Sequence, residues 1–175
     1  KMKMKSVIFD TEKNNWKQHE TQICSKLINK KNLVFLITTD DDIKFGGFLS
    51  SKIDKISQWI SDDKAFLFTF KENKSMKFDI KKDKKDHLFM LYDKSDFYLF
   101  VIGCCDIFIN KQNHPLSSIY QEVDSSFDYQ GIKNALIGKT IREDFFFSKK
   151  KKRMANGLLS AFFLGKERIC FRNIC

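Results

Sequence analysis

The most informative part of the sequence is Phe45-Gly46-Gly47-Phe48, a glycine doublet enclosed by phenylalanines within the apolar segment 43–49. This segment predicts a β-strand. A glycine inside a strand costs about 0.5–1 kcal/mol relative to alanine, because it loses more conformational freedom on folding. The doublet therefore indicates either a β-bulge or a place where another part of the backbone approaches closely.

The segments before the doublet predict a strand and a helix. Residues 33–37 are apolar without alternation, which favours a strand covered on both faces. Further upstream, apolar side chains recur at helical intervals and predict a helix that ends near residue 30. Asn15 can cap that helix by accepting the N–H of Gln18. The apolar side chains of this helix are Trp16, Ile23, Leu27 and Ile28.

The segment directly after the doublet predicts a second, shorter helix. Ser51 and Asp54 have the spacing of a capping box. Three isoleucines, Ile53, Ile56 and Ile60, follow at helical spacing.

From residue 66 onward the period changes to two, which is typical of strands. A polar link at 71–75 separates two such runs and predicts a β-hairpin. The apolar side chains of the two strands are Phe66, Phe68 and Phe70, then Met76, Phe78 and Ile80. Further strands are predicted at 88–92, 97–102 and 106–110. Many short strands with few helices predict an α+β fold, a two-sheet antiparallel β-sandwich flanked by short helices.

Length and charge narrow the class of protein. The 175 residues suit one domain with a substantial core. The formal net charge is +10, but all the arginines lie beyond residue 140. Because the body of the chain lacks the arginine forks that read bases and phosphates, direct nucleic-acid recognition by the body is not expected.

The five cysteines contain no C-x-x-C pair, so neither a zinc ribbon nor a disulfide framework is predicted. No segment has the length of a secretory signal or a transmembrane helix. We therefore expect an intracellular, cytoplasmic protein. The neighbouring Cys104 and Cys105 lie in an apolar stretch, which favours ordinary buried thiols over a redox switch.

No catalytic residue, cofactor or metal site is predicted. The acidic run 40–42 lacks the spacing of a calcium loop and predicts a solvated turn. His19, His87 and His114 are far apart and fit no metal-ligand frame. The sequence contains neither a nucleophile elbow nor a phosphate-binding glycine loop.

Taken in order, five segments of this sequence resemble the TLDc domain of the oxidation-resistance proteins. These segments are the glycine doublet, a tryptophan, a D-x-x-A-F-L-F-[ST] strand, a G-x-x-D-[LI]-x-I strand and a late L-x-G. The resemblance covers about residues 6–150. It rests on Phe45, Gly46, Gly47, Phe48, Trp59, Asp63, Ala65, Phe66, Phe68, Gly103, Asp106, Ile107, Ile109 and Gly138.

The resemblance implies a β-sandwich flanked by helices and a function in protein binding. TLDc proteins are associated with resistance to oxidative stress and with the peripheral stalk of the V-ATPase. The implied partner is thus a protein, and the implied location is the cytoplasm, peripheral to vacuolar or endolysosomal membranes. The family has no accepted catalytic site, so we expect a non-enzymatic module.

The last residues depart from the family pattern. After residue 148 the expected final strand gives way to the basic run Lys149, Lys150, Lys151, Lys152 and Arg153. We expect residues 151–175 to be a basic and apolar tail, either unstructured or aberrant through a frame shift in the lysine run. The basic run is either a solvated stretch or a nuclear-targeting or anionic-surface signal.

Two alternative functions stay open at this point. The first is a thiol-based redox sensor or enzyme that uses Cys104 and Cys105. The second is a nucleic-acid or membrane-surface binder that acts through the basic tail.

Overall fold

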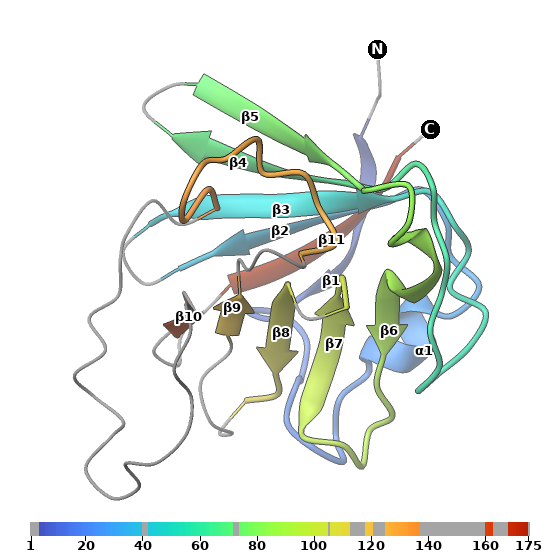
Figure 1. The fold of residues 1–175 in the computed structure, drawn as a ribbon. Helices are drawn as coiled ribbons and strands as arrows, with labels where there is room; N and C mark the ends of the chain where they lie inside the picture. Colours follow the sequence, from blue (N-terminus) through green and yellow to red (C-terminus); the bar gives the residue numbers. More distant parts are fainter. Residues whose placement is uncertain are drawn as a thin grey trace, which may run out of the picture.

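The computed structural model describes residues 4–39, 42–71, 74–104, 106–112, 118–120, 125–136, 160–162 and 168–174. These residues form two antiparallel sheets that face each other (Figure 1). The α+β sandwich predicted from the sequence is confirmed.

The larger sheet has six strands in the order β1-β11-β2-β3-β4-β5. Their bounds are β1 Met4–Asp10, β2 Leu33–Thr38, β3 Lys44–Leu49, β4 Phe66–Lys71, β5 Lys74–Asp79 and β11 Arg168–Ile174. All neighbouring strands are antiparallel. The predicted hairpin is therefore the pair β4–β5, with a tighter connection than expected.

The smaller sheet has the strand order β10-β9-β8-β7-β6. Its strands are β6 Phe89–Leu91, β7 Tyr98–Ile102, β8 Ile107–Asn110, β9 Ser118–Tyr120 and β10 Ser160–Phe162. A 3-10 turn, η1 Lys85–His87, precedes β6. The three strands predicted between residues 88 and 110 are thus confirmed.

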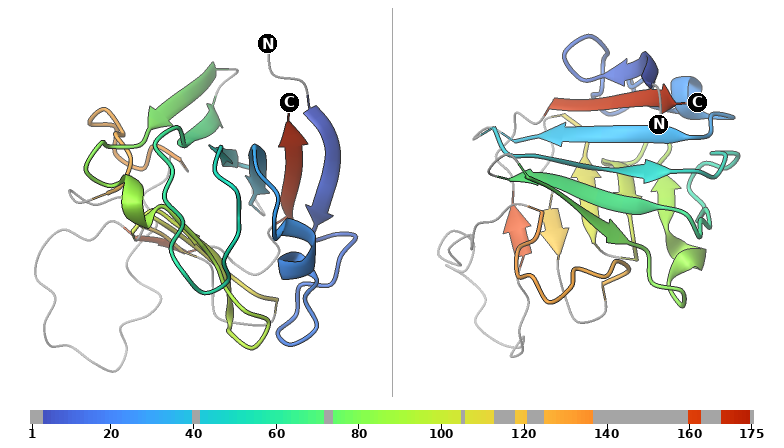
Figure 2. Two further views of the ribbon diagram at one scale, coloured as in Figure 1. Left: turned by 90° about the vertical axis from the view of Figure 1, so that its right-hand side faces the viewer. Right: turned by 90° about the horizontal axis from the view of Figure 1, so that it is seen from above.

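The two sheets pack face to face with their strands running crosswise (Figure 2). The core between them is rich in phenylalanine. Phe35 of β2 contacts Phe100 of β7 with ring centroids 6.1 Å apart, and Phe100 lies 5.9 Å from Phe89 of β6. All three rings are fully buried, so they join the layers into one core.

The strand β2 is covered on one face only, contrary to the expectation for residues 33–37. Leu33, Phe35 and Ile37 are buried against the smaller sheet. The side chains between them, Val34, Leu36 and Thr38, point to the other face and are half-buried.

The first predicted helix is much shorter than expected. Only α1, Ile23–Leu27, is helical. The Asn15 side chain accepts the N–H of Lys17 at 2.9 Å instead of that of Gln18, so it closes a turn before the helix and does not cap it. Trp16 is buried in this irregular segment. The helical spacing of the apolar residues in this segment therefore reflects their burial against the core and not a continuous helix.

The second predicted helix, after Ser51, is absent, and the segment is irregular. The Ser51 N–H donates to Asp62 at 2.9 Å, so the capping box does not form. Ile53 and Ile60 are buried, but each is held by backbone bonds to a distant segment: Ile53 N–H donates to Lys30 and Ile60 N–H to Phe89.

Two stretches of the segment 151–175, which we expected to be a tail, form strands: 160–162 is β10 and 168–174 is β11. β11 lies between β1 and β2 and pairs with β2 over six residues, from Arg168 to Asn173. The N-terminal strand β1, which the sequence did not reveal, lies next to β11 at one end of the strand order of the larger sheet. The two ends of the chain therefore lie side by side (Figure 2).

Candidate interaction surface

The glycine doublet is a place of close approach, as one of the two sequence interpretations predicted. The strand β3 pairs with β2 and β4 without a register shift, so there is no bulge. A Cβ on Gly46 would collide with the backbone carbonyl oxygen of Phe35, and one on Gly47 would collide with the Phe35 ring. The Phe68 ring leans over Gly46 from the neighbouring strand, as its Cζ lies 2.9 Å from that position. Phenylalanines thus cover the doublet on both faces of the sheet.

The aspartate of the D-x-x-A segment is Asp62, not Asp63 as we assigned from the sequence. The Asp62 carboxylate is buried and accepts four hydrogen bonds. The donors are Ser50 N–H at 2.6 Å, Ser50 Oγ at 2.6 Å, Ser51 N–H at 2.9 Å and Lys64 N–H at 2.9 Å. Asp63 is exposed. Counting three residues back from Ala65 is the signal that identifies Asp62.

Ala65 and Trp59, two further residues on which the resemblance rests, also contact neighbouring parts of the fold. Ala65 is buried at the start of the hairpin and its carbonyl accepts the Ile80 N–H. Trp59 is half-buried and its ring meets that of His87 edge-on, with centroids 5.6 Å apart.

The buried carboxylate of Asp106 fixes a loop against the smaller sheet. It accepts the N–H of Ser126 at 2.8 Å and the hydroxyl of Tyr129 at 3.2 Å. Gly103 turns the chain with a φ of +68°, and a Cβ there would collide with the Asp106 carboxylate. The glycine and the aspartate of the G-x-x-D segment are therefore required together. Ile107 and Ile109 of the same segment are fully buried in the core.

Burial raises the pKa of Asp106, and the hydrogen bonds from Ser126 and Tyr129 only partly oppose that effect. Burial and the neighbouring Asp106 also raise the pKa of Tyr129 well above its usual value. The Tyr129 hydroxyl donates to the Asp106 carboxylate, which also accepts the backbone N–H of Ser126. Both side chains therefore have a structural role in holding this loop.

Lys111 is a buried cation that the sequence did not reveal. Its ammonium group donates to the carbonyl of Asp93 at 2.5 Å and to that of Asp96. It thereby holds the turn between β6 and β7. Burial lowers the pKa of Lys111. A single lysine among 32 basic residues gives no sequence signal for this role.

The thiols described do not form a reactive pair. Cys24 donates to the carbonyl of Tyr92 at 3.1 Å, and burial raises the pKa of its thiol. Cys104 is exposed, contrary to our expectation of a buried thiol, and its N–H donates to Ser126 Oγ at 2.7 Å. Cys105 lies outside the described residues.

The outer face of the larger sheet carries an apolar surface that we call the aromatic face. The right-hand view of Figure 2 looks onto it. Adjacent rings stay in contact along β3 and β4: Phe48 to Phe66 at 5.3 Å, Phe66 to Phe68 at 6.4 Å and Phe68 to Phe70 at 5.5 Å. Phe70 is 53% exposed. The aromatic face consists of Val34, Leu36, Phe48, Phe66, Phe68 and Phe70.

Two lysines that border the aromatic face form ion pairs, and the register places Arg172 of β11 opposite Val34 and Arg168 opposite Thr38 at its other edge. Lys44 forms a 2.9 Å ion pair with Asp42, and Lys77 forms a 2.5 Å ion pair with Asp79. The Lys77 ammonium also lies 4.7 Å from the centroid of the Phe66 ring. The positive charges of Lys44 and Lys77 are therefore each balanced by a neighbouring aspartate.

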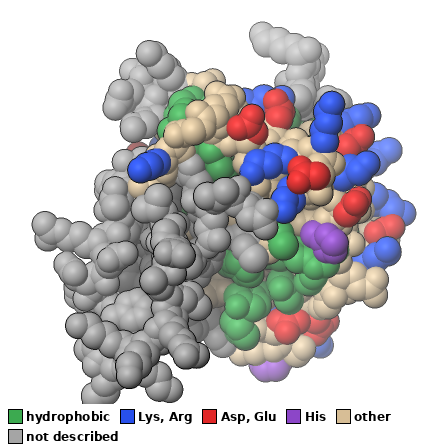
Figure 3. Space-filling model, in the orientation of Figure 1, with side chains coloured by type: hydrophobic (Ala, Val, Ile, Leu, Met, Phe, Trp, Pro, Cys, Tyr) green, Lys and Arg blue, Asp and Glu red, His purple; other side chains and the backbone are tan. Residues whose placement is uncertain are grey.

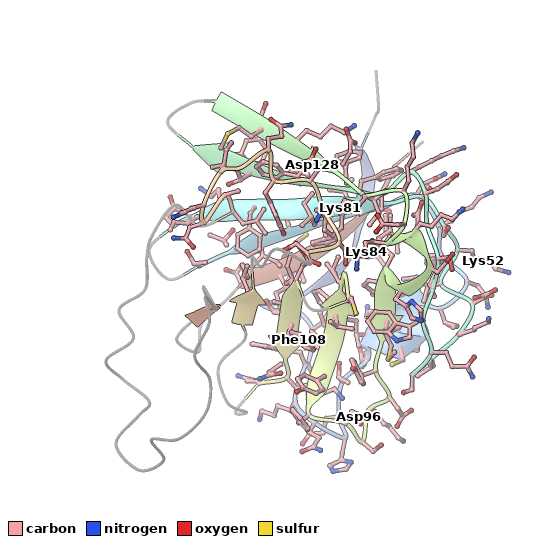
Figure 4. All side chains as sticks on the ribbon, viewed as in Figure 1. Lys52, Lys81, Lys84, Asp96, Phe108 and Asp128 are labelled. Atoms are coloured by element: carbon pink, nitrogen blue, oxygen red, sulfur yellow. The ribbon has the colours of Figure 1, made fainter. Side chains whose placement is uncertain are left out.

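A second, smaller apolar patch lies on the outer face of the smaller sheet. Figure 3 shows it as a green area beside acidic side chains, and Figure 4 places Phe108 and Asp96 there. Tyr98 is its centre, with ring centroids 3.9 Å from Phe97, 5.1 Å from Tyr92 and 5.6 Å from Phe108.

Within the described ranges, no three histidine, cysteine or acidic side chains gather as metal ligands. His19 and His87 are exposed, and Asp42 is exposed in its turn. Among the described residues, no helix is long and apolar enough to cross a membrane. Asp40, Asp41, His114, Gly138 and the basic run 149–153 fall outside the residues that the structure describes.

The fold and its motif residues define a small antiparallel two-sheet domain in which buried polar groups serve to fix loops. The chain belongs to the TLDc domain family, which matches residues 3–146. This confirms the resemblance found in the sequence. No curated protein sequence matches the chain significantly.

Proposed function

We propose that this chain is a non-catalytic protein-interaction module of the TLDc family. Its partner in this proposal is the peripheral stalk of the V-ATPase, and its role is protection against oxidative stress at vacuolar or endolysosomal membranes. Membership of the TLDc family supports the assignment of the chain as a protein-interaction module.

The hydrogen-bond partners of the buried ionisable groups also support a binding role. Asp62, Asp106 and Lys111 direct their hydrogen bonds largely to backbone groups that hold loops in place. A catalytic acid or base would instead have to reach a substrate atom. These three groups are therefore accounted for by folding.

The aromatic face is the observation that carries the proposal. A soluble antiparallel sheet that packs on one side normally shows polar side chains on the other. Here the outer side chains of β2, β3 and β4 are mainly aliphatic or aromatic, and Phe70 is largely exposed. Contiguous apolar surface of this kind is typical of interaction sites, and this supports the proposal of a protein partner.

The test is a binding measurement between the purified chain and detergent-solubilised V-ATPase. We expect the enzyme to be retained by the immobilised wild-type chain. The variant Phe70→Asp should weaken retention about tenfold, because it places a charge in an apolar contact. Ile132→Asp is the matched control, since Ile132 is also exposed, at 38%, but lies outside the aromatic face. Failure of the wild-type chain to retain the V-ATPase would contradict the proposed partner.

The same measurement separates the two alternative functions. Alkylation of the exposed Cys104 thiol should leave V-ATPase retention unchanged, whereas a thiol sensor would lose its response. The basic run should be tested by replacing residues 149–153 with serine. Truncation at residue 148 is unsuitable because it also removes β11 from the larger sheet.

A further inference from the structure

We infer that the outer edge of β5 pairs with a short extended segment of a partner protein, which adds an antiparallel strand to the larger sheet. The free edge, as we call it, consists of the backbone N–H and C=O groups of Ser75 and Lys77. β5 lies at one end of the strand order of the larger sheet, at the top of Figure 1. The inference rests on the proposed function in one respect only, namely that the partner is a protein.

Alternate residues of β5 direct their backbone groups away from β4. The Ile80 N–H donates towards the segment that leads into β4, whereas the carbonyl of its neighbour Asp79 accepts the N–H of Asp128 at 2.9 Å on the other side. Because this direction alternates along a strand, Ser75 and Lys77 face the same way as Asp79. In the part of the chain that the structure describes, these two residues have no backbone partner on that side.

The chain itself already pairs with the neighbouring part of this edge. Residues 126–128 run antiparallel to residues 79–81, which continue β5. The chain then turns at Gln130 and Gly131, both of which have positive φ. This side of β5 therefore accepts an antiparallel segment, and the pairing within the chain stops short of the free edge.

Lysine side chains often shield the edge strands of natural sheets. Lys77 does not shield this one, because its ammonium group lies 4.7 Å from the centroid of the Phe66 ring on β4 and 2.5 Å from Asp79. The Lys77 side chain is thus turned back over the outer face of the sheet. Irregular pairing does not protect the edge either, since β5 pairs with β4 without a register shift, whereas β1 pairs with β11 with two.

The side chains of β5 define what the added strand presents. Residues directly opposite each other in an antiparallel pair share one face of the sheet. Ser75 and Lys77 are exposed on the outer face, while Met76 between them is half-buried and packs against the core. The added strand therefore carries an apolar side chain opposite Met76 and polar side chains opposite its two neighbours.

A second copy of β5 does not fit this edge. Asp128 already lies opposite Asp79. A two-fold pairing that engages both Ser75 and Lys77 would place the link 72–73 of the second copy opposite Asp79 as well. A partner segment that begins or turns beside Asp128 avoids this overlap.

The free edge is tested by amide hydrogen exchange, measured by NMR with and without a peptide of about seven residues in which threonine and valine alternate. In the free chain, the N–H groups of Ser75 and Lys77 should exchange rapidly. The N–H of Met76 faces β4 and should exchange slowly. The peptide should slow exchange at Ser75 and Lys77 at least about tenfold and leave Met76 unchanged.

Two N-methylated peptides provide a matched control. Methyl groups on the threonine amides remove the N–H groups that face β5, whereas methyl groups on the valine amides remove only N–H groups that face away from it. In fluorescence anisotropy, the threonine-methylated peptide should bind at least about tenfold more weakly than the valine-methylated one. Equal binding of the two would overturn the inference, and this comparison does not depend on any variant of the chain.

The variant Lys77→Pro removes one N–H of the free edge at a position where an edge strand tolerates proline. It should weaken binding of the unmethylated peptide at least about tenfold, while Lys77→Ala, which keeps the N–H, should change it by less than about twofold. Circular dichroism checks that both variants are folded. Undiminished binding by folded Lys77→Pro would overturn the inference. So would slow exchange at Ser75 and Lys77 in the free chain, or a wild-type dimer that Lys77→Pro abolishes.

The fate of the V-ATPase proposal is separable from that of the free edge. Peptide binding without V-ATPase retention would leave the pairing at the free edge standing and refute the proposed partner. V-ATPase retention without peptide binding would refute the pairing alone.

Discussion

Single residues show why the sequence motifs of this chain take the form they do. Gly103 and Gly131 have similar backbone angles, with φ of +68° and +73°. They differ in their surroundings. A side chain at Gly103 would strike the Asp106 carboxylate, whereas nothing lies within 4 Å of the corresponding position at Gly131.

This difference gives a matched pair of substitutions. Gly131→Ala should cost about 1 kcal/mol, because alanine is strained at positive φ. Gly103→Ala should cost about 3 kcal/mol, since it adds a collision with a buried hydrogen-bonded carboxylate. Urea unfolding of the two variants measures both values. Equal losses would show that Gly103 is needed for its backbone angle alone.

Asp106 also makes stability depend on pH. Because burial raises its pKa in the folded state above the ordinary value of 3.8, the folded chain holds this proton more tightly than the unfolded chain does. Its contribution to the free energy of unfolding therefore decreases as the pH rises from about 3.8 through the raised pKa, and is constant above it. Asp106→Asn removes the titrating group. The stability difference, wild type minus variant, should decrease over that window in thermal unfolding scans, and a flat difference would contradict the raised pKa.

Lys111 provides a test of a buried charge that holds a turn. Lys111→Met keeps the apolar stem but leaves the carbonyls of Asp93 and Asp96 without their donor. The expected loss is about 1–3 kcal/mol in chemical unfolding. The exposed Lys94, in the same turn, is the control, and Lys94→Met should change stability by no more than about 0.5 kcal/mol. Equal effects of the two substitutions would argue against a role of Lys111 in holding the turn between β6 and β7.

At the scale of elements, the sequence predicted strands well and helices poorly, for a physical reason. Period-two runs such as 66–70 and 76–80 became strands because alternation matches the two faces of a sheet. The isoleucines after Ser51 have helical spacing, yet they anchor an irregular loop. There the Asp62 carboxylate takes the Ser51 N–H that a helix cap would need.

The identity of the candidate site was only partly predictable. The glycine doublet signalled a close approach, but the outward direction of Phe66, Phe68 and Phe70 depends on which face of β4 meets the smaller sheet. Alternation alone does not decide that choice. The strands β1 and β11 escaped prediction because each depends on a partner at the other end of the chain.

Ile169 tests the place of β11 in the larger sheet. Ile169 is fully buried, and it exchanges hydrogen bonds with Thr11: its N–H donates to Thr11 Oγ1, and its carbonyl accepts the Thr11 N–H. Ile169→Ala should cost about 2–4 kcal/mol and increase hydrogen exchange in β1. Ile132→Ala, at an exposed position, should cost less than about 1 kcal/mol. Unchanged stability of the Ile169 variant would mean that residues 168–174 do not belong to the sheet.

For the whole molecule, the positive charge is concentrated towards the C-terminal end of the sequence. The formal net charge is +10, with the arginines confined to the last part of the sequence. At the aromatic face, Lys44 and Lys77 are paired with aspartates, while Arg172 and Arg168 of β11 occupy positions opposite Val34 and Thr38 of β2. Because the aromatic face is mainly apolar and the run 149–153 is wholly basic, binding through each of them should respond differently to salt.

Binding through the aromatic face should weaken by less than about tenfold between 50 and 500 mM sodium chloride, because the face is apolar and the register adds at most Arg168 and Arg172 to its edge. Sulfate should strengthen it, since excluded salts favour burial of apolar surface. Binding through the basic run 149–153 would instead weaken tenfold or more over the same range. Measuring V-ATPase retention across this range, with the 149–153 serine variant as control, distinguishes the two modes. A steep salt dependence that this variant abolishes would assign recognition to the basic run, and would leave the aromatic face without a part in it.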